Sequence, residues 1–309
     1  MFYQQSQGFV LALTSMVLYG LYMVPRRKSS ASAGVFTFWM GWGILVSTTI
    51  IAFISGDMQH VGIDQYLMMF LSGILWATGT LGYLTSVQLI GLSRSTPIKN
   101  TSAVLGTLFG ILIFHEFSFD KYLPLGFAII GSGAIVASAT LLGRVEIPDD
   151  VENPRVNTKV LVYGVLCSLW AAIAYSAYTI PMKIAYSQGI SPSAFLLYMG
   201  QGCFMGMSIL AIIIDTNKPK EHTTTWKDRN LAQLAGIMWA VGSLCANSAV
   251  KLIGIAITWP ITKSTFVAVL YGVFILKEIN VKKHRTELNT GLLLSVIGVV
   301  LLGWAMSLN

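Results

Sequence analysis

Charged side chains are scarce in this sequence. Asp, Glu, Lys and Arg make up 11% of its 309 residues, whereas a soluble protein carries about 25%. Apolar residues make up 54% of the chain and its mean hydropathy is +0.68, so it cannot present a charged surface to water in every direction. We therefore expect an integral membrane protein of the plasma (inner) membrane, surrounded by the lipid bilayer.

Cysteine and histidine are rare as well. The three cysteines lie in apolar segments and the four histidines in polar connections, without the spacing of a disulfide framework or a metal site. The sequence also lacks a P-loop, an HExxH motif and an acidic residue in the middle of any apolar segment. These absences exclude an ATP-driven pump within this chain. They leave no set of groups for catalysis, so we expect no enzyme, no catalytic residue, no metal and no cofactor.

The apolar residues gather in long runs. A helix needs about 20 residues to cross the bilayer, and ten segments meet this requirement. Runs that are apolar on every face favour helices over the alternating strands of a membrane barrel. The expected spans are 8–25, 33–54, 66–88, 92–114, 122–143, 160–182, 193–214, 231–249, 253–276 and 289–308. The sequence thus predicts an all-α polytopic membrane protein with ten transmembrane helices.

Lys and Arg are distributed unevenly over the connections. One set of alternate loops holds fifteen of them and the other set holds three. Because cytoplasmic loops carry the excess of positive charge, the first set is expected to be cytoplasmic, which places both termini outside. The net charge of +7 is scattered over short connections, so it does not indicate a nucleic-acid partner.

The two halves of the sequence match each other in order, which indicates an internal duplication. The matching pairs are YMVP (22–25) with YTIP (178–181), WMGWG (39–43) with YMGQG (198–202), GILWATGTL (73–81) with GIMWAVGSL (236–244), and IGLSRSTPIKNTS (90–102) with IGIAITWPITKST (253–265). Five spans are an odd number, so the second copy must cross the membrane in the opposite sense, as in many secondary transporters. We expect two inverted five-helix repeats, over residues 1–143 and 160–309, joined by a cytoplasmic linker over 144–159.

At this point the chain resembles the drug/metabolite transporter superfamily, whose ten-helix members consist of two inverted five-helix repeats. The resemblance covers essentially the whole chain. It rests on TPIKNTSAVLGTLFGILIFHE (96–116) and WPITKSTFVAVLYGVFILKE (259–278), which look like the fourth and ninth helices of that superfamily. The short basic loop after the first span and the WGxL-type patterns look most similar to the glucose/ribose porter branch of sugar uptake proteins. The resemblance implies a central cavity surrounded by spans one to four and six to nine.

Aromatic and polar side chains within the spans are the candidates for binding a substrate. Flat rings with a polar edge suit a sugar, and Lys, Asn and Gln offer directional hydrogen bonds. The alternative for each ring is packing between helices. The candidates are Trp39, Trp42, Trp76, Tyr83, Lys99, Asn100, Tyr178, Tyr198, Gln201, Trp239 and Lys263. Trp76 and Trp239 occupy equivalent places in the two repeats and are the leading aromatic candidates.

Lys99 and Lys263 each lie within an apolar span, where an ammonium exposed to lipid costs about 3 kcal/mol. Such residues normally face a cavity. The alternative is that the long stem carries the ammonium group to the membrane interface.

Prolines and two acidic residues are candidates for conformational and coupling roles. Proline within a span removes one backbone hydrogen bond and bends the helix, so these positions are expected kinks or gates. They are Pro25, Pro97, Pro181 and Pro260. Glu116 and Glu278 end the fourth and ninth spans and are candidate coupling groups, with a structural role at the helix end as the alternative.

Together these features predict a secondary transporter that moves a small polar organic solute by alternating access. A sugar is favoured by the resemblance and by the aromatic rings. The alternative is a carrier or exporter of an anionic or amphipathic metabolite, such as an amino acid, a sugar acid or a phosphorylated compound, because a neutral sugar needs no fixed positive charge. The expected partners are this substrate and the bilayer, with no nucleic acid, and the protein is expected to be a monomer or a homodimer.

Overall fold

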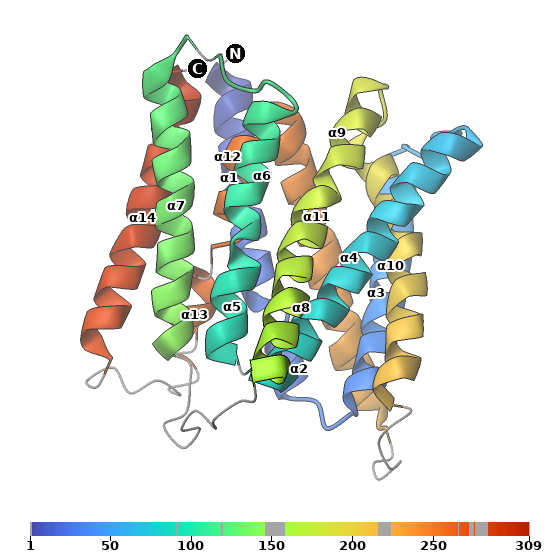
Figure 1. Cartoon of the computed structure of the whole chain (residues 1–309). Coiled ribbons are helices and arrows are strands. Elements are labelled where there is room, and N and C mark those ends of the chain that lie inside the picture. Colours follow the sequence, from blue (N-terminus) through green and yellow to red (C-terminus); the bar gives the residue numbers. More distant parts are fainter. Residues whose placement is uncertain are drawn as a thin grey trace.

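The computed structural model is a bundle of α-helices (Figure 1). The described residues are 2–90, 92–118, 120–145, 158–215, 224–264, 266–271, 275 and 284–308. Their helices are α1 (Phe2–Leu21), α2 (Val24–Arg27), α3 (Ala33–Ile54), α4 (Ile63–Ile90), α5 (Leu92–Asn100), α6 (Ser102–Leu112), α7 (Tyr122–Val145), α8 (Thr158–Ala177), α9 (Thr179–Ser187), α10 (Pro192–Asp215), α11 (Trp226–Ile253), α12 (Ile255–Thr262), α13 (Phe266–Tyr271) and α14 (Arg285–Leu308).

Within these ranges, eight helical segments are long and apolar enough to cross a membrane. Helices satisfy their own backbone polar groups, which is what a segment without access to water requires. The prediction of an all-α polytopic membrane protein is therefore confirmed. The observed ends differ from the expected ones by a few residues in most spans; α4, for example, covers Ile63–Ile90 where 66–88 was expected.

Four expected spans are divided into shorter pieces. The span 8–25 extends from α1 into α2, the span 160–182 extends from α8 into α9, and the other two lie in the middle of the bundle. The segment 92–114 consists of α5 and α6, which meet at Thr101, and 253–276 contains α12 and α13. Pro260 lies inside α12 and has no N–H to bond the carbonyl of Ala256. The Thr107 hydroxyl on α6 donates to that carbonyl at 3.0 Å, so a polar group released by the proline is satisfied by the neighbouring helix.

Small residues bring the long helices close together. A Cβ at Gly73 on α4 or at Gly202 on α10 would collide with the backbone of the opposite helix. The same holds for Gly43 on α3 and Gly236 on α11. These four positions allow the close packing of α4 with α10 and of α3 with α11.

The bundle has one group of helices at each edge and further helices between them (Figure 1). α7 and α14 pack against each other at one edge, and α3, α4 and α10 pack together at the other. The two termini lie at the same end of the bundle, and α2 lies at the opposite end (Figure 1). The divided helices α5, α6 and α12 stand in the middle, where they contact helices from both halves of the chain.

Candidate functional site

A cavity of about 160 Å³ lies in the middle of the bundle. Aromatic, hydroxyl and ammonium groups from both halves of the chain line it. They come from Tyr19, Gly20, Tyr22, Trp76, Tyr83, Lys99, Ser102, Tyr175, Trp239, Thr262, Lys263 and Ser264. Such a mixture of flat apolar faces and convergent polar groups is typical of a site for a small polar ligand.

Two tryptophans form one wall of the cavity. Trp76 on α4 and Trp239 on α11 have ring centroids 4.7 Å apart and planes inclined at 51°. Both side chains are otherwise buried, so each ring is held in place by the packing of its own helix. The sequence predicted these two positions as a pair, and the structure brings them into contact.

Tyrosines line the cavity beside the tryptophans and are fixed by hydrogen bonds. The Tyr19 hydroxyl and the Ser243 hydroxyl lie 2.8 Å apart. The Tyr175 hydroxyl donates to Thr80 Oγ1 at 3.0 Å. With their hydroxyls engaged by helices α11 and α4, these rings present mainly their faces to the cavity.

Lys263 follows the end of α12 and lines the cavity. Its ammonium nitrogen lies 4.4 Å from the ring centroid of Trp259, 5.4 Å from that of Tyr19 and 5.7 Å from that of Tyr175. Faces of aromatic rings attract a cation. Lys99 lines the same cavity, with its nitrogen 4.9 Å from the ring centroid of Tyr83. Both lysines predicted from the sequence thus face one cavity.

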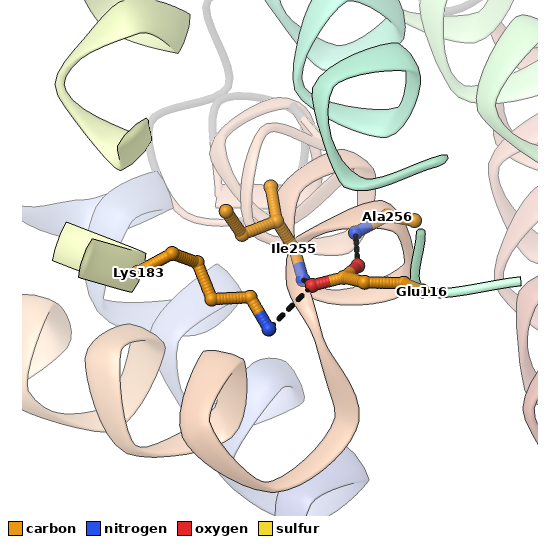
Figure 2. A network of polar contacts seen from close by, with 4 residues as sticks. All are labelled: Glu116, Lys183, Ile255 and Ala256. Carbon is orange, nitrogen blue, oxygen red and sulfur yellow. Dashed lines mark hydrogen bonds and ion pairs between the residues drawn. The ribbon is translucent and has the colours of Figure 1, made fainter. Parts of the chain in front are cut away.

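Glu116 follows α6, whose last turn lies at the end of the bundle that carries the termini (Figure 1), and it connects three parts of the bundle (Figure 2). Its carboxylate accepts hydrogen bonds from the backbone N–H groups of Ile255 and Ala256, each at 2.8 Å. These are the first residues of α12, and Gly254 before them has φ +81°. Lys183 on α9 lies 2.6 Å from Glu116 Oε1. A negative charge at a helix N-terminus is stabilising, so Glu116 anchors α12 and α9 together.

The sequence matches a known family over nearly its whole length. The profile of a family described as "Sugar transport protein" covers residues 10–305. The chain belongs to this sugar transport family. Among relatives, a "Putative sugar uptake protein" of Enterococcus faecalis is 25% identical over 301 residues, which cover 96% of this chain and 99% of that protein. The "Glucose uptake protein GlcU" of Bacillus subtilis is 25% identical over 298 residues, 96% of this chain and 98% of that protein.

A solved crystal structure of another protein has the same fold as this member of the sugar transport family. The two superpose with a TM-score of 0.74 over 95% of this chain and 97% of the other, at 12% sequence identity. At that level of identity the likeness concerns the arrangement of the helices.

Other residues predicted to bind substrate lie outside the cavity of this sugar transport protein. Trp42 on α3 is 40% exposed and borders an apolar groove on the outer surface of the bundle. Trp39 lies against the Arg229 guanidinium, 5.3 Å from the carbon to the ring centroid. The Tyr198 hydroxyl donates to the Gln59 carbonyl at 2.6 Å.

Three further candidates lie on helices in the middle of the bundle. Tyr178 is buried with its ring centroid 5.2 Å from that of Trp259. Asn100 ends α5 and is buried next to Lys99. Gln201 is half-buried on α10, and it too is not among the residues that line the cavity.

Three of the prolines predicted as kinks or gates lie in three different short helices. Pro25 lies in the first turn of α2, Pro97 in α5 and Pro181 in α9. Glu278 lies outside the described residues.

Sequence reasoning missed several members of the cavity in this sugar transport protein. Tyr19, Tyr22 and Tyr175 line it and were not among the candidates. The sequence did contain a signal for them. Tyr19 and Tyr22 stand before Pro25 at the same spacing at which Tyr175 and Tyr178 stand before Pro181. Extending that match by three residues would have found the pair Tyr19 and Tyr175.

Proposed function

We propose that this protein is a secondary transporter that moves a sugar across the membrane by alternating access. Its membership of the sugar transport family gives the class of activity, and relatives named for sugar or glucose uptake support the substrate. The observation that carries the proposal is the cavity, in which aromatic faces and hydroxyl groups from both halves of the chain converge. Aromatic faces suit the C–H faces of a sugar.

We further propose ten spans arranged as two inverted repeats, with α5–α6 and α12–α13 as the divided fourth and ninth spans. The support is a set of equivalent contacts. The glycine contact between α4 and α10 has its counterpart between α11 and α3. At one end of α3, Asp57 accepts a hydrogen bond from Ser193 at the start of α10. At the other end, Asp215 of α10 accepts one from Ser32 at the start of α3, at 2.9 Å.

Alternating access requires two closures that open in turn. We place one closure at Glu116, where the N-terminus of α12 and Lys183 meet. None of these groups is among the residues that line the cavity, and one lining residue, Tyr22, lies just before α2 at the opposite end of the bundle (Figure 1). We propose that in this arrangement the substrate site is closed toward the end of the bundle that carries the termini and opens toward the opposite end.

The excess of Lys and Arg in one set of loops supports a cytoplasmic position for that side, with both termini outside. Single cysteines at Gln4 and Ser307, in a protein whose three native cysteines are replaced, test this. Both are expected to react with a membrane-impermeant thiol reagent added to intact cells. Labelling of only one of them would contradict an even number of spans.

Transport itself is tested with purified protein in liposomes. Vesicles loaded with unlabelled glucose are expected to accumulate labelled glucose transiently, because exchange through a carrier outpaces net flow. L-glucose serves as the stereochemical control and empty liposomes as the background. Failure to exchange any member of a panel of hexoses and pentoses, neutral or acidic, would contradict the proposed function.

A further inference from the structure

Two tyrosines of the cavity are held by matching contacts from the two halves of the chain. The hydroxyls of Tyr19 on α1 and Ser243 on α11 lie 2.8 Å apart. On the other side, the hydroxyl of Tyr175 on α8 donates to Thr80 on α4 at 3.0 Å. Thr80 and Ser243 occupy the same place in the matching segments GILWATGTL and GIMWAVGSL, and each tyrosine stands six residues before a proline. The two contacts are therefore equivalent in the two halves.

The residue before each of these hydroxyl residues is a glycine that lies against the tyrosine ring. A Cβ at Gly242 would lie 3.1 Å from Cδ1 of Tyr19, and a Cβ at Gly79 would lie 3.1 Å from Cε1 of Tyr175. A residue without a Cβ allows the ring to lie this close to the helix. Each ring is thus fixed twice, along its edge by a glycine and at its hydroxyl by serine or threonine.

The fixed rings line the cavity, but the residues that fix them do not. Tyr19 and Tyr175 line it together with the two tryptophans, whereas Thr80 and Ser243 are not among the lining residues. Thr80 also donates to the backbone carbonyl of Trp76 at 3.1 Å. Any effect of Thr80 or Ser243 on a ligand in the cavity therefore passes through the side chains that they contact.

A sugar gains most from a ring that is already oriented. Its C–H faces lie against the flat side of an aromatic ring, and a mobile side chain that must be ordered at the moment of binding lowers the affinity. A tyrosine whose hydroxyl has a partner on the neighbouring helix avoids this cost. Tyr175 donates its one hydroxyl proton to Thr80, so it offers the ligand mainly its face.

We propose that Thr80 and Ser243 are positioning residues for sugar binding, which hold the rings of Tyr175 and Tyr19 as two equivalent faces for the substrate. This inference rests on the proposed function, since it names further determinants of sugar affinity in the same cavity. Because the two contacts are equivalent, each is expected to contribute to the affinity by a similar factor.

The test measures exchange of labelled glucose by the purified protein in liposomes over a range of glucose concentrations, which gives KM and the maximal rate. Ser243→Ala and Thr80→Ala are each expected to raise KM about 2- to 10-fold, the range for ordering one side chain on binding. The maximal rate per folded protein is expected to stay unchanged. A residue that acted in packing alone would lower the yield of folded protein or the maximal rate and leave KM as it is.

Conservative variants and a control separate positioning from a general loss of packing. Ser243→Thr and Thr80→Ser each introduce the residue that the other half of the chain holds at the equivalent place, and both are expected to keep the KM of the wild type. Thr78→Ala is the matched control. Thr78 donates to the Leu75 carbonyl within α4 at 2.8 Å and is not among the lining residues, so its loss is expected to leave KM unchanged.

Phenylalanine variants remove the same hydrogen bonds from the side of the rings. Tyr19→Phe is expected to raise KM as much as Ser243→Ala does, and the double variant no further, because both changes delete one contact. Tyr175→Phe is expected to relate to Thr80→Ala in the same way. These variants keep the ring in the cavity, so they test the inference even where an alanine variant fails to fold.

Three results would overturn the inference. The first is an unchanged KM in both alanine variants. The second is a loss of affinity in Tyr19→Phe that Ser243→Ala does not share, because the tyrosine hydroxyl would then bind the sugar directly. The third is a double variant in which the two effects multiply. In each case the wild type would still exchange glucose, and the proposed transport would stand; a wild type that exchanges no sugar would end both.

Discussion

The ammonium group of Lys183 lies 2.6 Å from Oε1 of Glu116, and the same carboxylate accepts the first two N–H groups of α12 (Figure 2). Glu116 is 10% exposed and Lys183 22% exposed, so water screens this contact less than it screens a pair on the surface. One side chain thereby joins the connection after α6 to two helices from the second half of the chain. We regard this junction as the closure on the side of the termini.

Glu116→Gln is expected to loosen this closure. The amide keeps one acceptor oxygen but loses the charge that interacts with Lys183 and with the N-terminus of α12, a loss of about 1–3 kcal/mol. A cysteine at Ser102 in the cavity, in a protein without its native cysteines, reports the effect. Its reaction with an impermeant thiol reagent from the outside is expected to become faster in the variant.

Asp120→Asn is the control for this change, because Asp120 is an exposed acid in the same connection. It is expected to leave the labelling rate of the cysteine unchanged. Equal rates in Glu116→Gln and the parent would place the closure elsewhere, even if the variant were less stable.

Trp239→Phe is expected to weaken binding of the preferred sugar by roughly 10-fold, about 1.4 kcal/mol, because a smaller ring covers less of the sugar and leaves the contact with Trp76 incomplete. Trp304→Phe is the matched control, because Trp304 is 55% exposed on α14 and is not among the residues that line the cavity. Equilibrium binding of the same probe to both variants checks the prediction. Equal affinities would remove Trp239 from the site.

Gly73→Ala is expected to lower stability by about 1–3 kcal/mol through overpacking, since the new Cβ would collide with the backbone of α10. Gly133→Ala on α7 provides the control, because a Cβ there meets no atom within 4 Å. Its helix propensity should rise slightly. Thermal unfolding in one detergent compares the two. A stable Gly73→Ala protein would mean that α4 and α10 can separate at little cost.

The sequence predicted the helical class because hydrophobic runs and the charge of the loops follow directly from the bilayer. Lys99, Lys263, Trp76 and Trp239 were among its candidates for binding a substrate, and the structure brings these four to one cavity. For the lysines the signal was the cost of an ammonium group within an apolar span, and for the tryptophans it was their equivalent places in the two halves of the sequence. The sequence did not predict the direction in which each side chain points. Trp42 faces outward although its sequence surroundings resemble those of the buried tryptophans, because helices that are apolar on every side carry no signal of which face meets the lipid.

The division of the fourth and ninth spans was not predicted either, for a different reason. Proline signals a bend, but whether the helix continues depends on what satisfies the released carbonyl. At Pro260 the partner is the hydroxyl of Thr107, which is distant in sequence. Likewise, Glu116 was expected as a coupling group or a structural helix end, and its contact with Ile255 depends on an arrangement of helices that sequence spacing does not contain.

Thr107→Val is expected to destabilise the junction of α6 with α12, because the Ala256 carbonyl, which Pro260 leaves without its helical donor, would lose the hydroxyl that now donates to it at 3.0 Å. An unsatisfied buried carbonyl costs about 1–3 kcal/mol, and valine has nearly the shape of threonine. Thr49→Val is the control. The Thr49 hydroxyl is exposed and donates to the Leu45 carbonyl within its own helix, where the backbone hydrogen bonds remain complete without it. Thermal unfolding should therefore separate the two variants, with only Thr107→Val shifted to lower temperature. Equal unfolding temperatures would show that the carbonyl released by Pro260 finds another donor, and that the divided ninth span does not depend on α6 for its shape.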